Sequence, residues 1–199
     1  MVQGLFDLLF SAFRYPPLKY GSRFGRRFEP SLFYGSRTIE TALAETAYYR
    51  LHFWFDMREP PPFGKLNTQH TAFTVQIKTK QGLQLQVAPF VRYEQSLINK
   101  SSYSETQLLG TIMRENNIEA FEYFSARDSN KGLNVGLFTP NVLKEKKASS
   151  TVNVLCSTHA DGVEFMDECS HVYNYYLDDF LDSGNFLYFS YQTLNCLFT

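Results

Sequence analysis

The sequence predicts a mixed α+β fold, and three observations support this prediction. An Ala-, Leu- and Glu-rich stretch at residues 38–53 has apolar side chains at the three- and four-residue steps of an amphipathic helix. Segments 70–79 and 82–90 instead alternate apolar and polar residues, as strands with one buried face do. Aromatic and apolar runs at 120–125 and 133–139 add two further strands.

The composition indicates a folded protein with a sizeable core and no bulk attraction to polyanions. The chain has 199 residues, is 44% hydrophobic and carries a net charge of -1. A charge near zero does not draw a protein to nucleic acid or to anionic lipid, so any anion-binding role must come from local clustering. We therefore expect neither direct nucleic-acid binding nor membrane association.

The cysteines and the N-terminus indicate a cytoplasmic protein without a metal site. The three Cys residues show no CxxC spacing and no nearby pair of His residues, so a zinc site is not expected. Reduced thiols agree with the cytosol. Residues 1–13 lack the basic region and cleavage site of a signal peptide, and no apolar window approaches the ~18 residues of a membrane span.

The N-terminal third is predicted to alternate helix, loop, strand and helix. Residues 4–13 place four apolar side chains on one helical face, and two prolines end that segment. Residues 18–31 form a basic loop that contains glycine, and residues 31–36 form a short strand. Ser36 or Thr38 can cap the helix that begins there.

The remaining elements follow from turn and capping signals. Three consecutive prolines break the chain within residues 58–65, and the segments 70–79 and 82–90 are predicted to pair as an antiparallel hairpin. Ser104 and Gln107 form a capping-box pattern that predicts a helix at 105–116. Residues 150–156 and the aromatic tail after 171 suit more strands and a short helix.

Two features have competing interpretations. Arg23, Arg26 and Arg27 lie among glycines in one loop, which suits either phosphate recognition or a solvated basic loop. Glu45 lies beside the apolar stripe of its helix, so it is exposed, paired with Arg50, or functional. Neither GxGxxG nor the P-loop pattern occurs.

The order of the motifs resembles the RES domain family, which is named for an arginine, a glutamate and a serine. The matching segments are 21–24 (GSRF), 34–36 (YGS), 42–45 (ALAE) and 123–127 (YFSAR), with Tyr34 eleven residues before Glu45. Phe24 stands where the family usually has Trp, and Ser22 where it usually has a second Gly. The resemblance covers roughly residues 13–140 of a single predicted domain at 1–199, leaving 141–199 as a C-terminal extension.

This resemblance implies a fold like that of ADP-ribosyltransferases, a split antiparallel β-sheet with flanking helices, and NAD as the substrate. It implies that Glu45, Arg23 and Ser125 are catalytic, with Glu45 stabilising the ribose cation as nicotinamide leaves. Ser125 follows a strand without a GxSxG turn or a suitable His, so a serine-hydrolase role is not expected.

The same resemblance implies a larger set of NAD-binding residues. The pyrophosphate is assigned to arginines and the nicotinamide ribose to aromatic and hydroxyl side chains. The set is Arg14, Tyr15, Arg23, Tyr34, Glu45 and Ser125. Arg14 precedes Tyr15 and is an alternative for the family's first arginine, so the choice of pyrophosphate clamp among Arg14, Arg23 and Arg26 stays open.

The function implied is cleavage of the nicotinamide–ribose bond by an NAD glycohydrolase or phosphorylase. Such a protein acts as the toxin of a toxin–antitoxin pair and is held silent by a helix-turn-helix (Xre-type) antitoxin. Two alternatives remain, a protein mono-ADP-ribosyltransferase and a catalytically silent binding module. A homodimer is compatible with the sequence, and no metal is implied.

Overall fold

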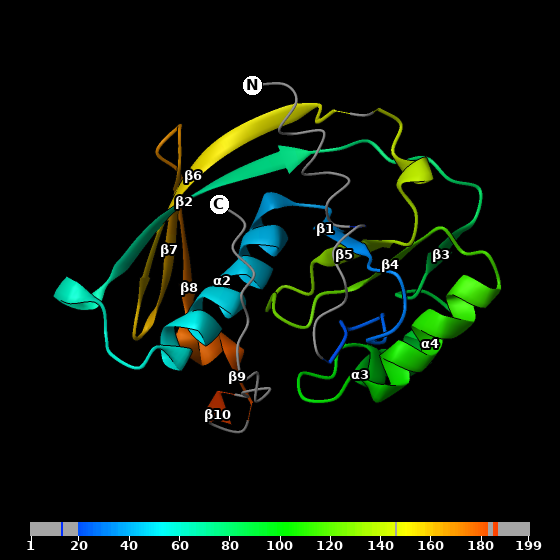
Figure 1. The fold of residues 1–199 in the computed structure, drawn as a ribbon, viewed down its shortest axis with the longest axis horizontal. Coiled ribbons are helices and arrows are strands. Elements are labelled where there is room, and N and C mark those ends of the chain that lie inside the picture. The colour runs from blue at the N-terminus through cyan, green and yellow to red at the C-terminus, as the bar shows by residue number, and fades with distance from the viewer. Residues whose placement is uncertain (1–12, 14–19, 146, 183–184, 187–199) are drawn as a thin grey trace.

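Two four-stranded sheets lie on either side of a long central helix (Figure 1). The computed structural model describes residues 13, 20–145, 147–182 and 185–186. The first sheet has the order β1 (Phe33–Ser36), β5 (Leu133–Leu137), β4 (Ala120–Phe124) and β3 (Gly82–Gln84). The second has the order β2 (Leu66–Thr74), β6 (Ser150–His159), β7 (Gly162–Asp167) and β8 (Val172–Tyr176). The helices are α2 (Ile39–Asp56), α3 (Glu94–Leu97) and α4 (Ser104–Glu115).

Short elements complete the described part of the chain. Four single turns of 3₁₀-helix are η1 (Pro62–Gly64), η2 (Phe90–Tyr93), η3 (Pro140–Val142) and η4 (Leu177–Phe180). A two-stranded ribbon joins β9 (Leu181–Asp182) to β10 (Asn185–Phe186). The helix predicted at 4–13, apart from Phe13, lies outside the described residues.

The α+β prediction is confirmed, and the split into two sheets matches the predicted architecture. Every strand pair of the second sheet is antiparallel. The first sheet is mixed, because β1–β5 and β4–β5 are antiparallel whereas β3–β4 is parallel. The sheets therefore depart from a purely antiparallel arrangement at this one pairing of the described strands.

Helix α2 begins where the sequence predicted it. Thr38 is the N-cap residue, and its side-chain oxygen accepts a hydrogen bond from the Thr41 N–H at 3.3 Å. The helix ends near Asp56, shortly before the prolines at 60–62 that prevent its continuation. This capping fixes the rotation of the helix and so determines which side chains face each sheet.

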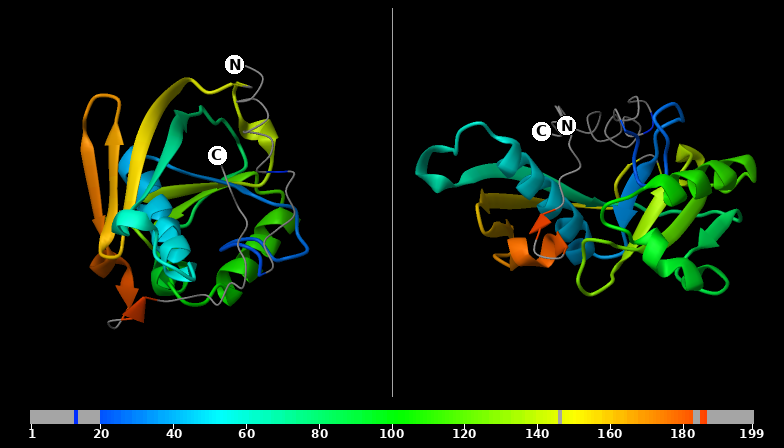
Figure 2. Two further views of the ribbon diagram at one scale, coloured as in Figure 1. Left: turned by 60° about the vertical axis from the view of Figure 1, so that its left-hand side comes forward. Right: turned by 90° about the horizontal axis from the view of Figure 1, so that it is seen from below.

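One face of α2 is covered by the second sheet, and the helix also contacts β1 and β5 of the first, as the turned views of Figure 2 show. Leu43, Ala47, Tyr48 and Leu51 pack into a core with Val154, Cys156, Val163 and Phe165 of the second sheet, and with Phe180 of η4. Full burial of a side chain such as Leu51 contributes roughly 1.5–3 kcal/mol. The position of α2 is therefore fixed mainly by its packing on the second sheet.

A second core lies between the first sheet and helix α4. Phe24 is completely buried there, with its ring centroid 4.6 Å from that of Phe121 and 4.7 Å from that of Tyr123. Gly110 of α4 has no room for a side chain, because a Cβ there would lie 2.0 Å from the Phe24 carbonyl oxygen. This close approach anchors the 21–24 segment to the molecule.

The predicted hairpin of residues 70–79 and 82–90 is wrong. Strand β2 pairs with β6 of the second sheet, while β3 pairs with β4 of the first. Between them the chain crosses from one sheet to the other, and the Lys78 N–H donates to the Val142 carbonyl at 2.8 Å. Alternation identified the strand character of β2 and β3, but it carries no information about the partner.

The capping box predicted for α4 is also absent. The N-cap residue is Tyr103, which makes no side-chain capping hydrogen bond. The Gln107 amide instead donates to the carbonyls of Tyr20 and Ser22, at 3.0 Å each. A tertiary contact with the 21–24 segment has taken the place of the local cap, although the helix itself forms as predicted.

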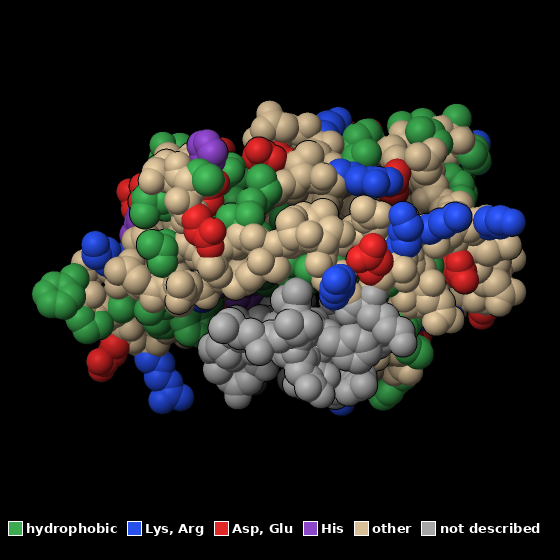
Figure 3. Space-filling model, turned by 90° about the horizontal axis from the view of Figure 1, so that it is seen from above, with side chains coloured by type: hydrophobic (Ala, Val, Ile, Leu, Met, Phe, Trp, Pro, Cys, Tyr) green, Lys and Arg blue, Asp and Glu red, His purple; other side chains and the backbone are tan. Residues whose placement is uncertain are grey.

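The surface shows neither a bilayer-spanning helix nor a uniform charge. Each helix within the described residues is too short or too polar to cross a bilayer. On the face drawn in Figure 3, Lys and Arg side chains are interspersed with Asp and Glu rather than gathered into one continuous patch.

The turn between β4 and β5 packs tightly against α2 through Gly132. A Cβ at Gly132 would lie 2.0 Å from the Thr41 Oγ1 and 2.4 Å from an Asp128 carboxylate oxygen. Thr41 Oγ1 also donates to that carboxylate at 2.8 Å. The absence of a side chain at position 132 thus allows this turn to contact the helix.

We predict that Gly132→Ala lowers the free energy of unfolding by about 1–3 kcal/mol, because the turn or the helix must move to admit the methyl group. Urea denaturation measures this change. Gly82→Ala is the control, since the nearest atom to a Cβ there is a Thr79 methyl carbon at 3.3 Å. Equal stability of the two variants would contradict this description of the contact.

Candidate active site

Glu45 is held at the junction of α2 and the first sheet by two neutral hydrogen-bond donors. Its Oε1 accepts from the Ser125 hydroxyl at 2.7 Å and from the Asn134 amide at 2.6 Å. Ser125 follows β4 and Asn134 lies in β5, and both are almost fully buried. No described residue hydrogen-bonds the second oxygen, Oε2. The carboxylate is thus oriented through one oxygen and leaves the other available.

The Ser125 hydroxyl is saturated by protein partners. Its hydrogen goes to Glu45, and its oxygen accepts from the backbone N–H groups of Arg127 and Asp128, at 3.0 Å each. A serine hydroxyl has one donor and two acceptor positions, and all three are used here. Ser125 therefore positions Glu45 in this arrangement and has no capacity left for a ligand.

Asn134 extends the same network to β1. Its amide oxygen accepts from the Ser36 hydroxyl at 2.7 Å while its nitrogen donates to Glu45. Ser36 and Asn134 are directly opposite each other in the β1–β5 register. The side-chain amide is consequently fixed in one orientation, with its nitrogen toward the carboxylate.

Successive turns of α2 meet the loop that follows β4. Thr41 contacts Asp128, Glu45 contacts Ser125, and the Arg127 guanidinium carbon lies 3.5 Å from the ring centroid of Tyr48. Steps of four and three residues place 41, 45 and 48 on one helical stripe. The helical period therefore presents a carboxylate, a hydroxyl and an aromatic face to one short loop.

Arg23 lies close to this carboxylate without forming an ion pair with it. Its Nη1 donates to the carbonyls of Leu97 at 3.1 Å and Asn99 at 2.8 Å, and its guanidinium carbon lies 4.5 Å from the Tyr103 ring centroid. Burial lowers the pKa of Arg23, but Tyr103, Tyr123 and the Glu45 carboxylate outweigh it and raise the pKa above its usual value. Arg23 is therefore a fixed cation near Glu45.

Tyr34 holds the loop that carries Arg23. Its hydroxyl lies 2.9 Å from the Ser22 Oγ and accepts a hydrogen bond from the Phe24 N–H at 3.1 Å. Burial raises the pKa of Tyr34 to about 12. In this arrangement the hydroxyl positions the 22–24 segment.

The buried carboxylate Glu122 differs from Glu45 in having both oxygens occupied. One oxygen accepts from the Arg37 guanidinium and the other from the amides of Gln84 and Gln86. Burial raises its pKa, but these donors outweigh burial and lower it. Glu122 thus has no free acceptor, which favours Glu45 as the functional carboxylate.

The structure brings three of the predicted site residues together, and two others lie outside the described residues. Glu45 and Ser125 are in contact and Arg23 is close by, whereas Arg14 and Tyr15 fall in the segment that is not described. Sequence reasoning missed Asn134, whose signal was a polar residue in the middle of an apolar strand, LNVGL. It also gave no role to Arg127, although that residue was part of the quoted YFSAR motif.

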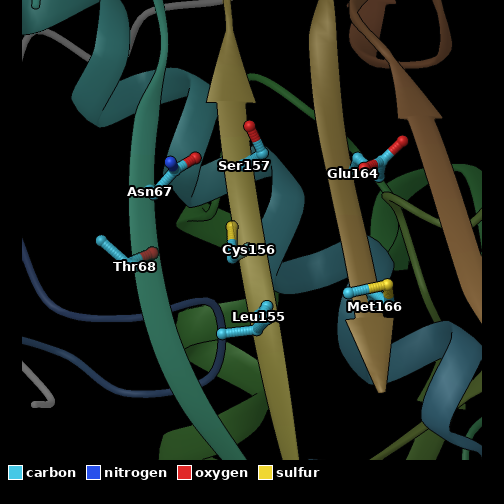
Figure 4. Close-up of a pocket in the computed structure, with 7 residues that line it drawn as sticks. All are labelled: Asn67, Thr68, Leu155, Cys156, Ser157, Glu164 and Met166. Carbon is cyan, nitrogen blue, oxygen red and sulfur yellow. The ribbon is translucent and has the colours of Figure 1, made fainter. Parts of the chain in front are cut away.

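Glu45 lines neither of two surface hollows. One of about 240 Å³ lies on the second sheet, where Leu155 and Met166 are paired neighbours (Figure 4). Another of about 200 Å³ is polar and includes Asn99 and Ser102. Among the described residues, no group of three His, Cys, Asp or Glu side chains is placed to hold a metal ion.

Comparison with known families matches the RES domain over residues 2–156. The chain belongs to the RES domain family. This match confirms the resemblance seen in the order of the motifs. No curated protein matches the chain. RES domains are known for NAD-related toxin activity and are associated in general with Xre-type antitoxins.

For this RES domain, we predict that Tyr34→Phe costs about 1 kcal/mol of stability at neutral pH, because Phe24 N–H loses its acceptor. The pKa of Tyr34 is about 12 in the folded protein and near 10 in the unfolded chain. The contribution of its hydroxyl to the free energy of unfolding is therefore complete below pH 10 and is lost as the pH rises through 12. Denaturation at pH 9 to 12 should therefore show a shallower decline in the variant.

Tyr93→Phe is the matched control, because Tyr93 is about half exposed. Its pH dependence should follow that of the unmodified protein. A Tyr34→Phe variant with the same alkaline decline as the unmodified protein would show that the Tyr34 hydroxyl is not buried and hydrogen-bonded as described.

Proposed function

We propose that this RES domain cleaves the nicotinamide–ribose bond of NAD. The observation that carries the proposal is the state of Glu45, whose Oε1 is fixed by two neutral donors while Oε2 is available. Pairing with neutral donors orients a carboxylate without neutralising it. RES domains in general process NAD, and this arrangement supplies the single oriented negative charge that such a reaction uses.

The proposed reaction proceeds by departure of the leaving group. The bond between the ribose C1″ and the nicotinamide nitrogen breaks, and its electron pair passes to the nitrogen, which becomes neutral. Positive charge develops on the ribose, as in glycoside cleavage, and the Glu45 carboxylate stabilises it. Attack on C1″ by a water or phosphate oxygen then completes the transfer, with loss of a proton when water is the acceptor.

The other site residues support Glu45 or hold the substrate. Ser125 and Asn134 act as positioning residues, because their polar atoms are fully engaged in orienting the carboxylate. Arg23 is the proposed pyrophosphate clamp, since its cation is held near Glu45 by carbonyl groups and not neutralised by a carboxylate. Tyr34 supports the Arg23 loop.

The biological role proposed is that of a toxin controlled by an Xre-type antitoxin, which follows from the family. Incubation of the purified protein with NAD, with and without phosphate, tests the chemistry. Free ADP-ribose identifies a hydrolase, its 1″-phosphate a phosphorylase, and a modified protein a transferase. A well-folded protein that consumes no NAD under any of these conditions would refute the proposal.

We predict that Glu45→Gln reduces NAD turnover by roughly 100-fold or more, if stabilisation of the ribose cation contributes about 3 kcal/mol. The Gln side-chain oxygen still accepts from Ser125 and Asn134, so the fold should be preserved. Loss of NAD measures turnover, and urea denaturation measures stability.

Glu40→Gln is the control for this substitution. Glu40 is exposed in the first turn of the same helix, so its removal changes the net charge equally without touching the network. Its turnover should stay within about twofold of the unmodified protein. Full activity of Glu45→Gln would eliminate the assigned role of the carboxylate.

A second prediction concerns Arg23→Met, which keeps the length of the side chain and removes its charge. We expect the dissociation constant for NAD to rise by about tenfold or more, with a smaller change in turnover at saturating NAD. Isothermal titration calorimetry on the Glu45→Gln background measures binding without consumption of the ligand.

The matched control is Arg26→Met in the same loop, because Arg26 is exposed. Its affinity for NAD should be unchanged. If Arg26→Met instead loses affinity for NAD and Arg23→Met keeps it, Arg26 is the residue that binds the pyrophosphate.

A further inference from the structure

We propose that Arg127 and Lys100 form a phosphate-binding subsite beside the Glu45–Ser125 pair. The ligand chemistry is a phosphate group, supplied either by the pyrophosphate of a dinucleotide or by inorganic phosphate. The dinucleotide source rests on the proposed function, whereas binding of inorganic phosphate does not.

Arg127 is a buried cation without a carboxylate partner. Only 4% of its surface is exposed, and none of the described Asp or Glu side chains forms a salt bridge with it. Nearly all buried charges in proteins are paired or bind a counter-ion, because an isolated buried ion is expensive. A guanidinium in this state indicates that its counter-ion is an external anion.

The hydrogen-bond inventory of Arg127 points to the same conclusion. Its Nη2 donates to the Lys100 carbonyl at 3.2 Å, and its guanidinium carbon lies 3.5 Å from the ring centroid of Tyr48. Its Nη1 is buried and has no hydrogen-bond partner among the described residues. A residue that served only to tie the loop to α2 would place this nitrogen on an acceptor or in solvent.

Lys100 supplies a second cation next to Arg127. Its Nζ makes only a long contact of 3.4 Å to the Leu181 carbonyl. Burial and the charge of Arg127 lower the pKa of Lys100, while Asp182 and Asp179 partly offset this. Two cations that repel each other across a partly buried space are stabilised together by one bound anion.

One short segment places Arg127 close to Arg23. Arg23 donates to the carbonyls of Leu97 and Asn99, and Arg127 donates to the carbonyl of Lys100, the next residue. The two guanidiniums are thus anchored to consecutive positions of the same backbone. Two guanidiniums anchored in this way suit the two phosphates of a pyrophosphate, each contacted by one fork-shaped donor.

The backbone of Arg127 also connects it to the proposed catalytic carboxylate. Its N–H donates to the Ser125 hydroxyl, which in turn donates to Glu45. Burial raises the pKa of Tyr48, while the charges of both Arg127 and Arg23 lower it and Glu45 raises it. Arg127 stacks on the ring of Tyr48, which lies one helical turn after Glu45 in α2, so a phosphate on Arg127 is near the carboxylate.

The test compares Arg127→Met with Arg92→Met, a variant of an exposed arginine that stacks on Tyr93. Calorimetry with the full chain measures the binding of inorganic phosphate, ADP-ribose and nicotinamide riboside, which has no phosphate. We expect Arg127→Met to weaken binding of a phosphate-bearing ligand by about tenfold or more and to leave nicotinamide riboside within twofold. Arg92→Met should bind all three as the unmodified protein does.

The pattern of losses identifies the source of the phosphate. Weaker ADP-ribose binding assigns the subsite to the dinucleotide, and a loss confined to inorganic phosphate assigns it to the free anion. Unchanged affinity for both overturns the proposal. Equal weakening of all three ligands, or lower stability with unchanged affinities, assigns Arg127 a purely structural role and overturns it as well.

Two further measurements keep the proposal testable and separate it from the proposed function. If Arg127→Met does not fold, Lys100→Met should weaken binding of the same phosphate-bearing ligand at least threefold, and unchanged affinity counts against the subsite. If the protein binds ADP-ribose through Arg127 but consumes no NAD, the subsite is supported and the proposed function is refuted. If it consumes NAD while phosphate binding does not depend on Arg127 or Lys100, the proposed function is supported and the subsite is refuted.

Discussion

The arrangement of the candidate site depends on the two hydrogen bonds that Glu45 Oε1 accepts from Ser125 and Asn134. These bonds join helix α2 to the end of β4 and to β5, and both strands lie far from α2 in the sequence. Because both donors are neutral, the carboxylate is oriented and still charged. A salt bridge in the same place would orient it equally well but cancel most of its field, as Arg37 does for Glu122.

The cations of the site, like the carboxylate, are held by neutral groups. Arg23 and Arg127 both donate to backbone carbonyls at the end of α3 and in the segment that follows it, so they are held without being neutralised. Opposite charges thus lie close to one another and remain unpaired. Fixed and unpaired charges of this kind need no reorganisation when a charged ligand arrives, which is the condition for electrostatic stabilisation in an active site.

Local signals predicted much of the fold, and tertiary contacts account for the errors. The period of residues 38–53 and the Thr38 cap identified α2 because both are properties of a few neighbouring residues. The partners of β2 and β3 depend on the crossing between the sheets, which no short window contains. The Gln107 amide does not form the expected cap, because it donates to two carbonyls more than eighty residues away.

Spacing alone did not predict the site. The contact of Glu45 with Ser125 spans 80 residues, and only the order of the motifs brought the two together. Asn134 and Arg127 were missed because a buried amide and a buried guanidinium have meaning only once their neighbours are known.

The placement of α2 between two sheets has a consequence for the dynamics of the protein. Because one face of the helix is packed in the core on the second sheet, the amides on that face are shielded from solvent unless the core itself opens. Glu45 is part of this helix, so local opening elsewhere in the described residues would leave the carboxylate in place.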